Sequence, residues 1–167
     1  WEDIDFIDVP GKLIPEWLGV RNRPSASAAH RYTIDRHMVE VVTRLGRETP
    51  SGGRYDDRHY EALLLAGILH DIGKRPGVAN HAAEGARHAT VVVERMGFDR
   101  DIVRWVTLLV REHLTLSEFA TGRNPNDPNV GDDLAGRLDH NPVLLDMLFD
   151  LTRADGSSLG ATSGETI

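Results

Sequence analysis

The sequence contains no cysteine, which excludes disulfide bonds and thiolate metal ligands. A reducing compartment is the simpler interpretation, and we expect a cytoplasmic location. Any transition-metal site must then use imidazole and carboxylate groups. The 167 residues include eight histidines, which is more than an average domain of this size carries. Ligands of the imidazole type are therefore available.

The sequence also lacks long apolar runs and an excess of basic residues. No run approaches the roughly 18 apolar residues that a membrane span needs. The opening stretch, WEDIDFIDVPGK, is acidic and lacks the basic start of a signal peptide. The net charge of −7 argues against a generic binder of phosphate backbones. We therefore expect neither a membrane nor a nucleic acid as a partner.

The hydrophobic pattern is helical and shows no sustained alternation of the kind that strands require. Residues 38, 41, 42 and 45, for example, are apolar and follow the spacing of one helix face. The fold class predicted is all-α, a bundle of five main helices plus short helices. The main helices are expected from residues 34 to 46, 57 to 72, 81 to 96, 99 to 113 and 142 to 155, with a short helix at 132–138.

The chain is long enough for one domain with its own core. We expect residues 1–29 to be an irregular lead-in with one helical turn at about 15–18, because prolines are frequent there. The domain proper is expected at 30–160, and residues 161–167 are expected to form a frayed tail. Four polar residues, Asp56 or Asp57, Asn80, Asp99 and Asn141, are placed to cap helices.

One adjacent pair, His70-Asp71, ends the most apolar of the predicted helices. A buried carboxylate is costly unless it is paired or bound to a metal. Neighbouring side chains on a helix point about 100° apart, so the two can bind one ion only near a helix end or where the helix bends. Gly73 supplies such an end.

Other histidines and one further aspartate fall at helix ends or on inward faces. Taken alone, each also fits a core or surface role. Taken together they form an ordered set with one or two members on each helix, and a helical bundle can converge such groups into a metal site. The predicted ligands are His37, His70, Asp71, His81, His113 and Asp155. His88 and Glu84 share the face of His81, and we interpret His88 as a surface residue.

The order of these residues, with the motif LHDIGK, resembles the HD-domain metal-dependent phosphohydrolase superfamily. The motifs PEWLGVRNRP, HRYTIDRH, NHAAEGA, VREHLTLSEFAT and LTRADGSSLG narrow the resemblance. Over about residues 12–160 the chain is similar to the HD domain of bifunctional uridylyltransferase/uridylyl-removing enzymes. The fold implied is the HD-domain helical bundle.

The resemblance assigns roles to the candidate residues. His37, His70, Asp71 and Asp155 match the first metal site of the superfamily, and His81 and His113 match the extra histidines of its two-metal members. The implied cofactor is one or two divalent ions, with Mn, Fe, Mg, Ni and Zn not distinguished. Asp71 would bridge two ions, and Lys74 would neutralise a phosphate oxygen. Glu112, beside His113, stays unassigned.

The implied reaction is metal-dependent phosphodiester hydrolysis that removes a uridylyl or adenylyl group from a tyrosine of the PII nitrogen-regulatory protein. Full-length family members also carry a nucleotidyltransferase domain and ACT domains, which this sequence lacks, so we expect an excised domain. Two alternatives stay open: an HD hydrolase of small nucleotides, and a metal-bound regulatory module without catalysis.

Overall fold

The structure is a computed structural model that describes residues 1–26, 31–124 and 126–159. Within these ranges the regular structure is helical, and the pairing of Pro24 with Thr33 is an isolated β-bridge. The predicted all-α class is confirmed. Among the described residues, no helix combines the length and the apolar character needed to cross a bilayer.

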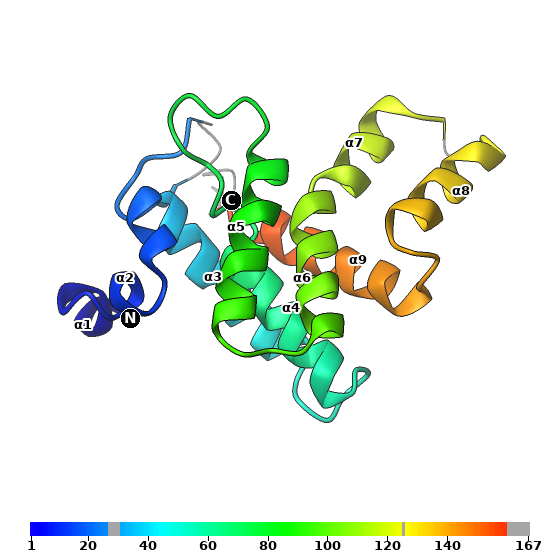
Figure 1. Cartoon of the computed structure of the whole chain (residues 1–167). Helices are drawn as coiled ribbons and strands as arrows, with labels where there is room; N and C mark the ends of the chain where they lie inside the picture. Colours follow the sequence, from blue (N-terminus) through cyan, green and yellow to red (C-terminus); the bar gives the residue numbers. More distant parts are fainter. Residues whose placement is uncertain (27–30, 125, 160–167) are drawn as a thin grey trace, which may run out of the picture.

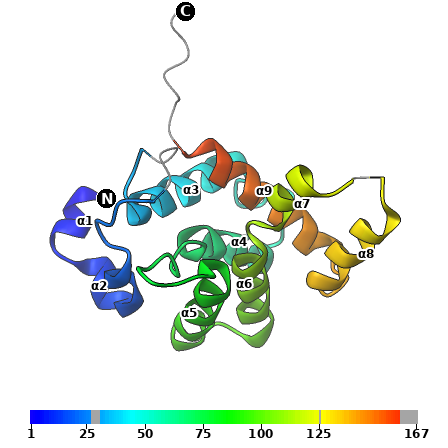
Figure 2. The ribbon, with the colours of Figure 1, turned by 90° about the horizontal axis from the view of Figure 1, so that it is seen from above.

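Five longer helices form the body of the described chain, as Figures 1 and 2 show. They are α3 (Ile34–Glu48), α4 (Asp57–Leu69), α5 (His81–Arg95), α6 (Arg100–Glu112) and α9 (Pro142–Ser157). Shorter segments flank them: α1 (Glu2–Phe6), α2 (Val9–Leu13), the 3₁₀-helix η1 (Pro15–Gly19), α7 (Thr115–Gly122) and α8 (Pro128–Arg137). The five main helices predicted from the hydrophobic pattern are all present.

Helix α4 lies at the centre of the bundle and packs against α3, α5, α6 and α9. Its buried residues include Leu63, Ala66 and Leu69, which are spread around the helix. A Cβ atom at Gly67 would lie 2.7 Å from Leu45 Cδ1, so the absence of a side chain there lets α3 approach closely. The prediction that this helix is central and buried is therefore confirmed.

Side chains cap four of the main helices as the sequence predicts. Each accepts a hydrogen bond from a backbone N–H in the first turn, which satisfies a donor that has no partner within the helix. These capping residues are Asp56, Asn80, Asp99 and Asn141.

The N-terminal segment holds more helix than the sequence indicated. The expected turn at residues 15–18 is present as η1, but α1 and α2 precede it where an irregular chain was expected. Helices this short are unstable alone, so tertiary contacts must hold them. Trp1 packs edge-on against the buried Trp17 at 5.7 Å between ring centroids, and Arg21 donates to the Asp5 carboxylate at 3.0 Å.

Other elements also differ from the prediction, and helix α4 ends at Leu69 instead of at residue 72. Helix α3 continues past Gly46, which has open space around it and is tolerated within the helix. Helix α7 was not predicted, and α8 begins at Pro128 rather than at residue 132. Asp127 caps α8 by accepting from Asn129 N at 3.0 Å, a signal present in the sequence as Asp-Pro. The predicted tail, 161–167, lies outside the described residues.

The loop from α4 to α5 passes against the backbone of α5. A Cβ atom at Gly73 would lie 2.2 Å from the carbonyl oxygen of His81 and 2.3 Å from the backbone nitrogen of Gly85. Only a glycine allows this approach, because no real side chain tolerates such distances. The contact fixes the residues just before Gly73 beside the first turn of α5.

We expect Gly73→Ala to destabilise the protein by about 2 kcal/mol or more, because the added methyl group pushes the loop away from α5. Gly46→Ala is the matched control, and it should stabilise by about 0.5–1 kcal/mol because alanine favours a helix interior. Urea unfolding measures both. An equal effect of the two substitutions on the free energy of unfolding would contradict this account of the loop.

Candidate metal centre

The ends of five described helices meet at one place, and the six side chains predicted as ligands lie there. One is in the first turn of α3, two follow the last residues of α4 and α6, and the others belong to the α4–α5 loop, the start of α5 and the last turn of α9. In chain order they are His37, His70, Asp71, His81, His113 and Asp155.

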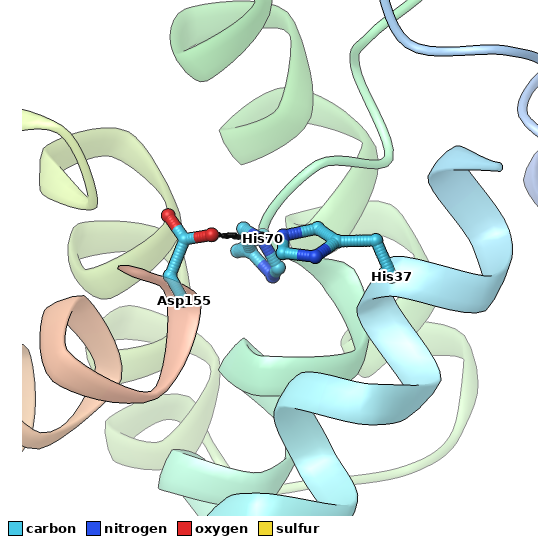
Figure 3. A group of neighbouring side chains, drawn as sticks. All are labelled: His37, His70 and Asp155. Carbon is cyan, nitrogen blue, oxygen red and sulfur yellow. Dashed lines mark hydrogen bonds and ion pairs between the residues drawn. The ribbon is translucent and has the colours of Figure 1, made fainter. Parts of the chain in front are cut away.

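The first group consists of His37, His70 and Asp155, shown in Figure 3. His37 Nε2 lies 2.8 Å from Asp155 Oδ1, and His70 Nε2 lies 3.7 Å from the same oxygen. One ligand atom from each residue lies within 4.8 Å of the others. Three donors at these distances can hold one metal ion.

The second group consists of Asp71, His81 and His113. The Nε2 atoms of both histidines lie 3.5 Å from Asp71 Oδ1. One ligand atom from each of these residues lies within 4.8 Å of the others, so this group can also hold an ion.

Asp71 joins the two groups. Its Oδ1 faces His81 and His113, while its Oδ2 lies 3.6 Å from His70 Nε2 in the first group. The rings of His70 and His113 are 5.3 Å apart between centroids, so the groups are contiguous. A carboxylate with one oxygen toward each group has the geometry of a bridging ligand.

Backbone carbonyls orient two of the histidine rings. His70 Nδ1 lies 2.8 Å from Gly67 O, and His113 Nδ1 lies 2.7 Å from Val110 O. A carbonyl only accepts, so Nδ1 carries the hydrogen and a neutral ring has its lone pair on Nε2. In both cases the carbonyl belongs to the residue three positions before a histidine at a helix end, so this contact can be predicted from the sequence once the helix end is known.

The inward nitrogen atoms have the character of metal ligands. The Nε2 atoms of His70, His81 and His113 are buried and have no hydrogen-bond partner among the described residues. Buried polar atoms without a partner are costly and call for an explanation. A cation between these nitrogens and the two carboxylates would satisfy them, so the residues present fit a divalent metal.

The charges in the centre favour a positive group between the carboxylates. Burial alone would raise the pKa of Asp71, but His70, His113 and Lys74 outweigh it and hold that pKa well below its usual range. Burial alone would lower the pKa of His70, but Asp71 and Asp155 raise it to about 9. Without a metal, His70 therefore carries a proton at neutral pH, in a position where a cation would replace it.

Lys74, the other residue to which a catalytic role was assigned, lies at the edge of the centre. Its Nζ donates to Asp71 Oδ2 at 2.9 Å, so in this structure it contacts a carboxylate. The side chains of Lys74, His81 and Asp155 are 26%, 24% and 21% exposed, whereas that of Asp71 is 3% exposed. Solvent therefore reaches the centre at these three side chains, which we call its exposed edge.

The acidic and histidine residues left unassigned lie outside both groups. Glu112 is buried and accepts from Thr115 Oγ1 at 2.6 Å and from Arg137 Nη1 at 3.2 Å, which connects the end of α6 to α8. His88 Nε2 lies 3.0 Å from Glu84 Oε1 on α5, and its side chain is only 13% exposed, so the interpretation of His88 as a surface residue is wrong. Neither Glu112 nor His88 belongs to a ligand group found among the described residues.

The chain has relatives among characterised proteins, although no protein-family model matches it. It is 36% identical over 159 residues to the bifunctional uridylyltransferase/uridylyl-removing enzyme of Mycobacterium tuberculosis, which covers 95% of this chain and 19% of that enzyme. The enzyme of the same name from Streptomyces coelicolor is 37% identical, covering 96% of this chain and 18% of the enzyme. For the Caulobacter vibrioides enzyme the identity is 36%, and the match covers 91% of this chain and 17% of the enzyme.

The match covers 19% of the length of the Mycobacterium tuberculosis enzyme, so the chain spans about a fifth of the length of the curated relatives it matches. Identity at this level over nearly all of the present sequence establishes common descent with that segment. The chain is homologous to part of the bifunctional uridylyltransferase/uridylyl-removing enzymes.

Proposed function

We propose that this chain is a metal-dependent phosphodiesterase domain that removes a nucleotidyl group, UMP or AMP, from a modified tyrosine of the PII signal protein. The observation that carries the proposal is the pair of ligand groups joined through Asp71. The homologous enzymes are named for uridylyl removal, which supports the substrate class. The nucleotidyltransferase and ACT domains would be its partners within a longer chain, and the cytoplasmic location stays a prediction.

The proposed ligands are His37, His70 and Asp155 for one ion and Asp71, His81 and His113 for a second. A bound divalent ion, whether Mn, Fe, Mg, Ni or Zn, would lower the pKa of a water molecule toward about 7 and neutralise charge at phosphorus. Each group offers three protein ligands, which would leave a coordination position open for water, and this favours catalysis over a purely structural site, where protein ligands fill every position.

The reaction needs one water molecule and releases a phenol. The water oxygen forms a bond to phosphorus, the bond from phosphorus to the tyrosyl oxygen breaks, and the electron pair stays on that oxygen. The proton lost by the water passes to solvent, and the phenolate later regains one. A phenol has a pKa of about 10, so its anion leaves without strong acid assistance.

The protein side chains would hold the substrate in place for this step. Asp71 fixes the positions of both ligand groups relative to each other. The Lys74 ammonium, with its flexible stem at the exposed edge, would turn from Asp71 to a phosphate oxygen.

The first test compares Asp71→Ala with His88→Ala. Losing Asp71 removes the link between the groups, so we expect metal content to fall and turnover of nucleotidylated PII to drop by about 10³-fold or more. His88 lies outside the groups and its loss should change turnover less than about twofold. Metal analysis and release of UMP or AMP, with Mn, Mg and Fe supplied separately, measure both variants.

The same assay separates the three functions considered. Hydrolysis of nucleotidylated PII but not of free nucleotides supports the proposal, and the reverse would favour a nucleotide hydrolase. Bound metal without hydrolysis of nucleotidylated PII or of bis(p-nitrophenyl) phosphate would favour a metal-bound regulatory module. Full metal content and turnover in Asp71→Ala would contradict the site assignment.

The two ligand groups predict separable metal losses. His37→Ala and His81→Ala each remove one ligand from a different group, so each variant should lose about one equivalent of Mn²⁺ and keep the other. Titration followed by electron paramagnetic resonance measures the stoichiometry. Loss of both ions in both variants would show that the groups do not bind independently.

Metal binding should also release protons. His70 has a pKa of about 9 in the metal-free protein and must be neutral to bind a cation. At pH 7 binding should therefore release about one proton from His70, and affinity should rise with pH until it levels near pH 9. Calorimetry in buffers of different ionisation enthalpy measures the release. A binding enthalpy that is independent of the buffer would contradict this protonation state.

A further inference from the structure

Two cavities share His81 as a lining residue. The Lys74 cavity, of about 490 Å³, lies between the segment before α3 and the α4–α5 loop. The Glu112 cavity, of about 530 Å³, lies among α5, α6, α7 and α8. Figure 1 shows the α4–α5 loop beside the chain that leads into α3, with α7 and α8 on the other side of α6.

The Lys74 cavity combines flat apolar walls with fixed positive charge. Its lining includes Pro24, Ile34, Pro76 and Val78, together with Arg23, Lys74 and Arg75. Arg75 is held in place because its Nη2 donates to Glu16 O at 2.6 Å, and a Cβ atom at Gly19 would lie 2.3 Å from its Cζ. Apolar walls suit the faces of a nucleobase, the cations suit a phosphate, and the volume lies in the range of small-molecule sites.

The Glu112 cavity has a different chemistry. Its charged residues are of both signs and come from four helices: His81, Arg111, Glu112, Glu118 and Arg137. Glu112 and Arg137 are paired at 3.2 Å, so they form a rigid polar wall. Charged groups of both signs suit the polar groups of an extended polypeptide. The apolar residues of this cavity are mainly alanines, which offer a nucleobase less contact than Pro24, Ile34, Pro76 and Val78 offer in the Lys74 cavity.

We propose that the Lys74 cavity holds the nucleoside of the substrate and that the Glu112 cavity receives the tyrosine-bearing segment of the protein substrate. This inference rests on the function proposed above. A phosphodiester carries two substituents on one phosphorus atom, so a centre that cleaves it must accommodate both. His81 lines both cavities and lies 3.5 Å from Asp71, so a phosphorus atom held beside it could direct one substituent into each cavity.

The first experiment measures binding to the Mn²⁺-loaded 167-residue chain by calorimetry, with UMP, AMP and inorganic phosphate as probes. We expect the preferred nucleotide to bind at least about tenfold more tightly than phosphate, because the nucleoside adds contacts in the Lys74 cavity. Val78→Trp fills this cavity and should reduce the ratio of nucleotide affinity to phosphate affinity to about twofold or less. Val91→Trp, the same change at an exposed position of α5, should keep the full ratio.

The second experiment addresses the Glu112 cavity. Glu118→Trp should leave the ratio of nucleotide to phosphate affinity unchanged and raise KM for nucleotidylated PII by about fivefold or more. Circular dichroism melting shows that each variant is folded. The inference would be overturned if Val78→Trp kept the full ratio of nucleotide to phosphate affinity, or if Glu118→Trp reduced that ratio. It would also be overturned if the unaltered chain showed no preference for a nucleotide.

The outcomes distinguish this inference from the proposed function. If the unaltered chain hydrolyses nucleotidylated PII but shows no nucleotide preference, the assignment of the cavities is wrong and the function stands. If nucleotides bind with the expected preference but no phosphodiester is cleaved, the cavity holds a nucleoside and the proposed function fails.

Discussion

The burial of Asp71 is the constraint on which the rest of the structure depends. Its side chain is 3% exposed, and a carboxylate in that environment costs several kcal/mol unless positive or hydrogen-bonding groups surround it. His70, His81, His113 and Lys74 supply these groups. His70, His81 and His113 lie at the ends of three helices, so these ends must converge for the carboxylate to be surrounded. The apolar core holds the bundle together, and the candidate metal centre lies where the helix ends of that bundle meet.

Local helix physics supports the arrangement. His70 and His113 follow the last residues of α4 and α6, and each ring donates its Nδ1 hydrogen to a carbonyl at this end of the helix, where unpaired carbonyls and the negative end of the helix dipole lie. Asp155 in the last turn of α9 is unfavourable by the same argument, and His37 compensates by contacting it at 2.8 Å. The closest backbone approach, at Gly73, then keeps Asp71 beside the start of α5. Fold stability and site geometry are therefore coupled through one loop.

The sequence predicts the features that depend on local patterns. Apolar spacing is sufficient for α3, and apolar spacing with capping residues is sufficient for α4, α5, α6 and α9. The adjacency of His70 and Asp71 requires a helix end, which occurs at Leu69. Features that depend on contacts distant in sequence are not predictable in this way. Helices α1 and α2 exist because of packing such as that of Trp1 on Trp17, and Lys74 contacts Asp71 because of the turn between them. Spacing alone also cannot show that Glu112 faces Arg137 while its neighbour His113 faces Asp71.

The central claim is that Asp71 joins two cation sites built by helix ends. Its most direct test is a crystal structure of the Mn²⁺-loaded chain with anomalous diffraction recorded at the manganese edge. The account predicts anomalous peaks on both sides of the Asp71 carboxylate, one toward His37, His70 and Asp155 and one toward His81 and His113. Peaks only at outer positions such as Glu84 and His88, with the side chains around Asp71 unchanged, would contradict it.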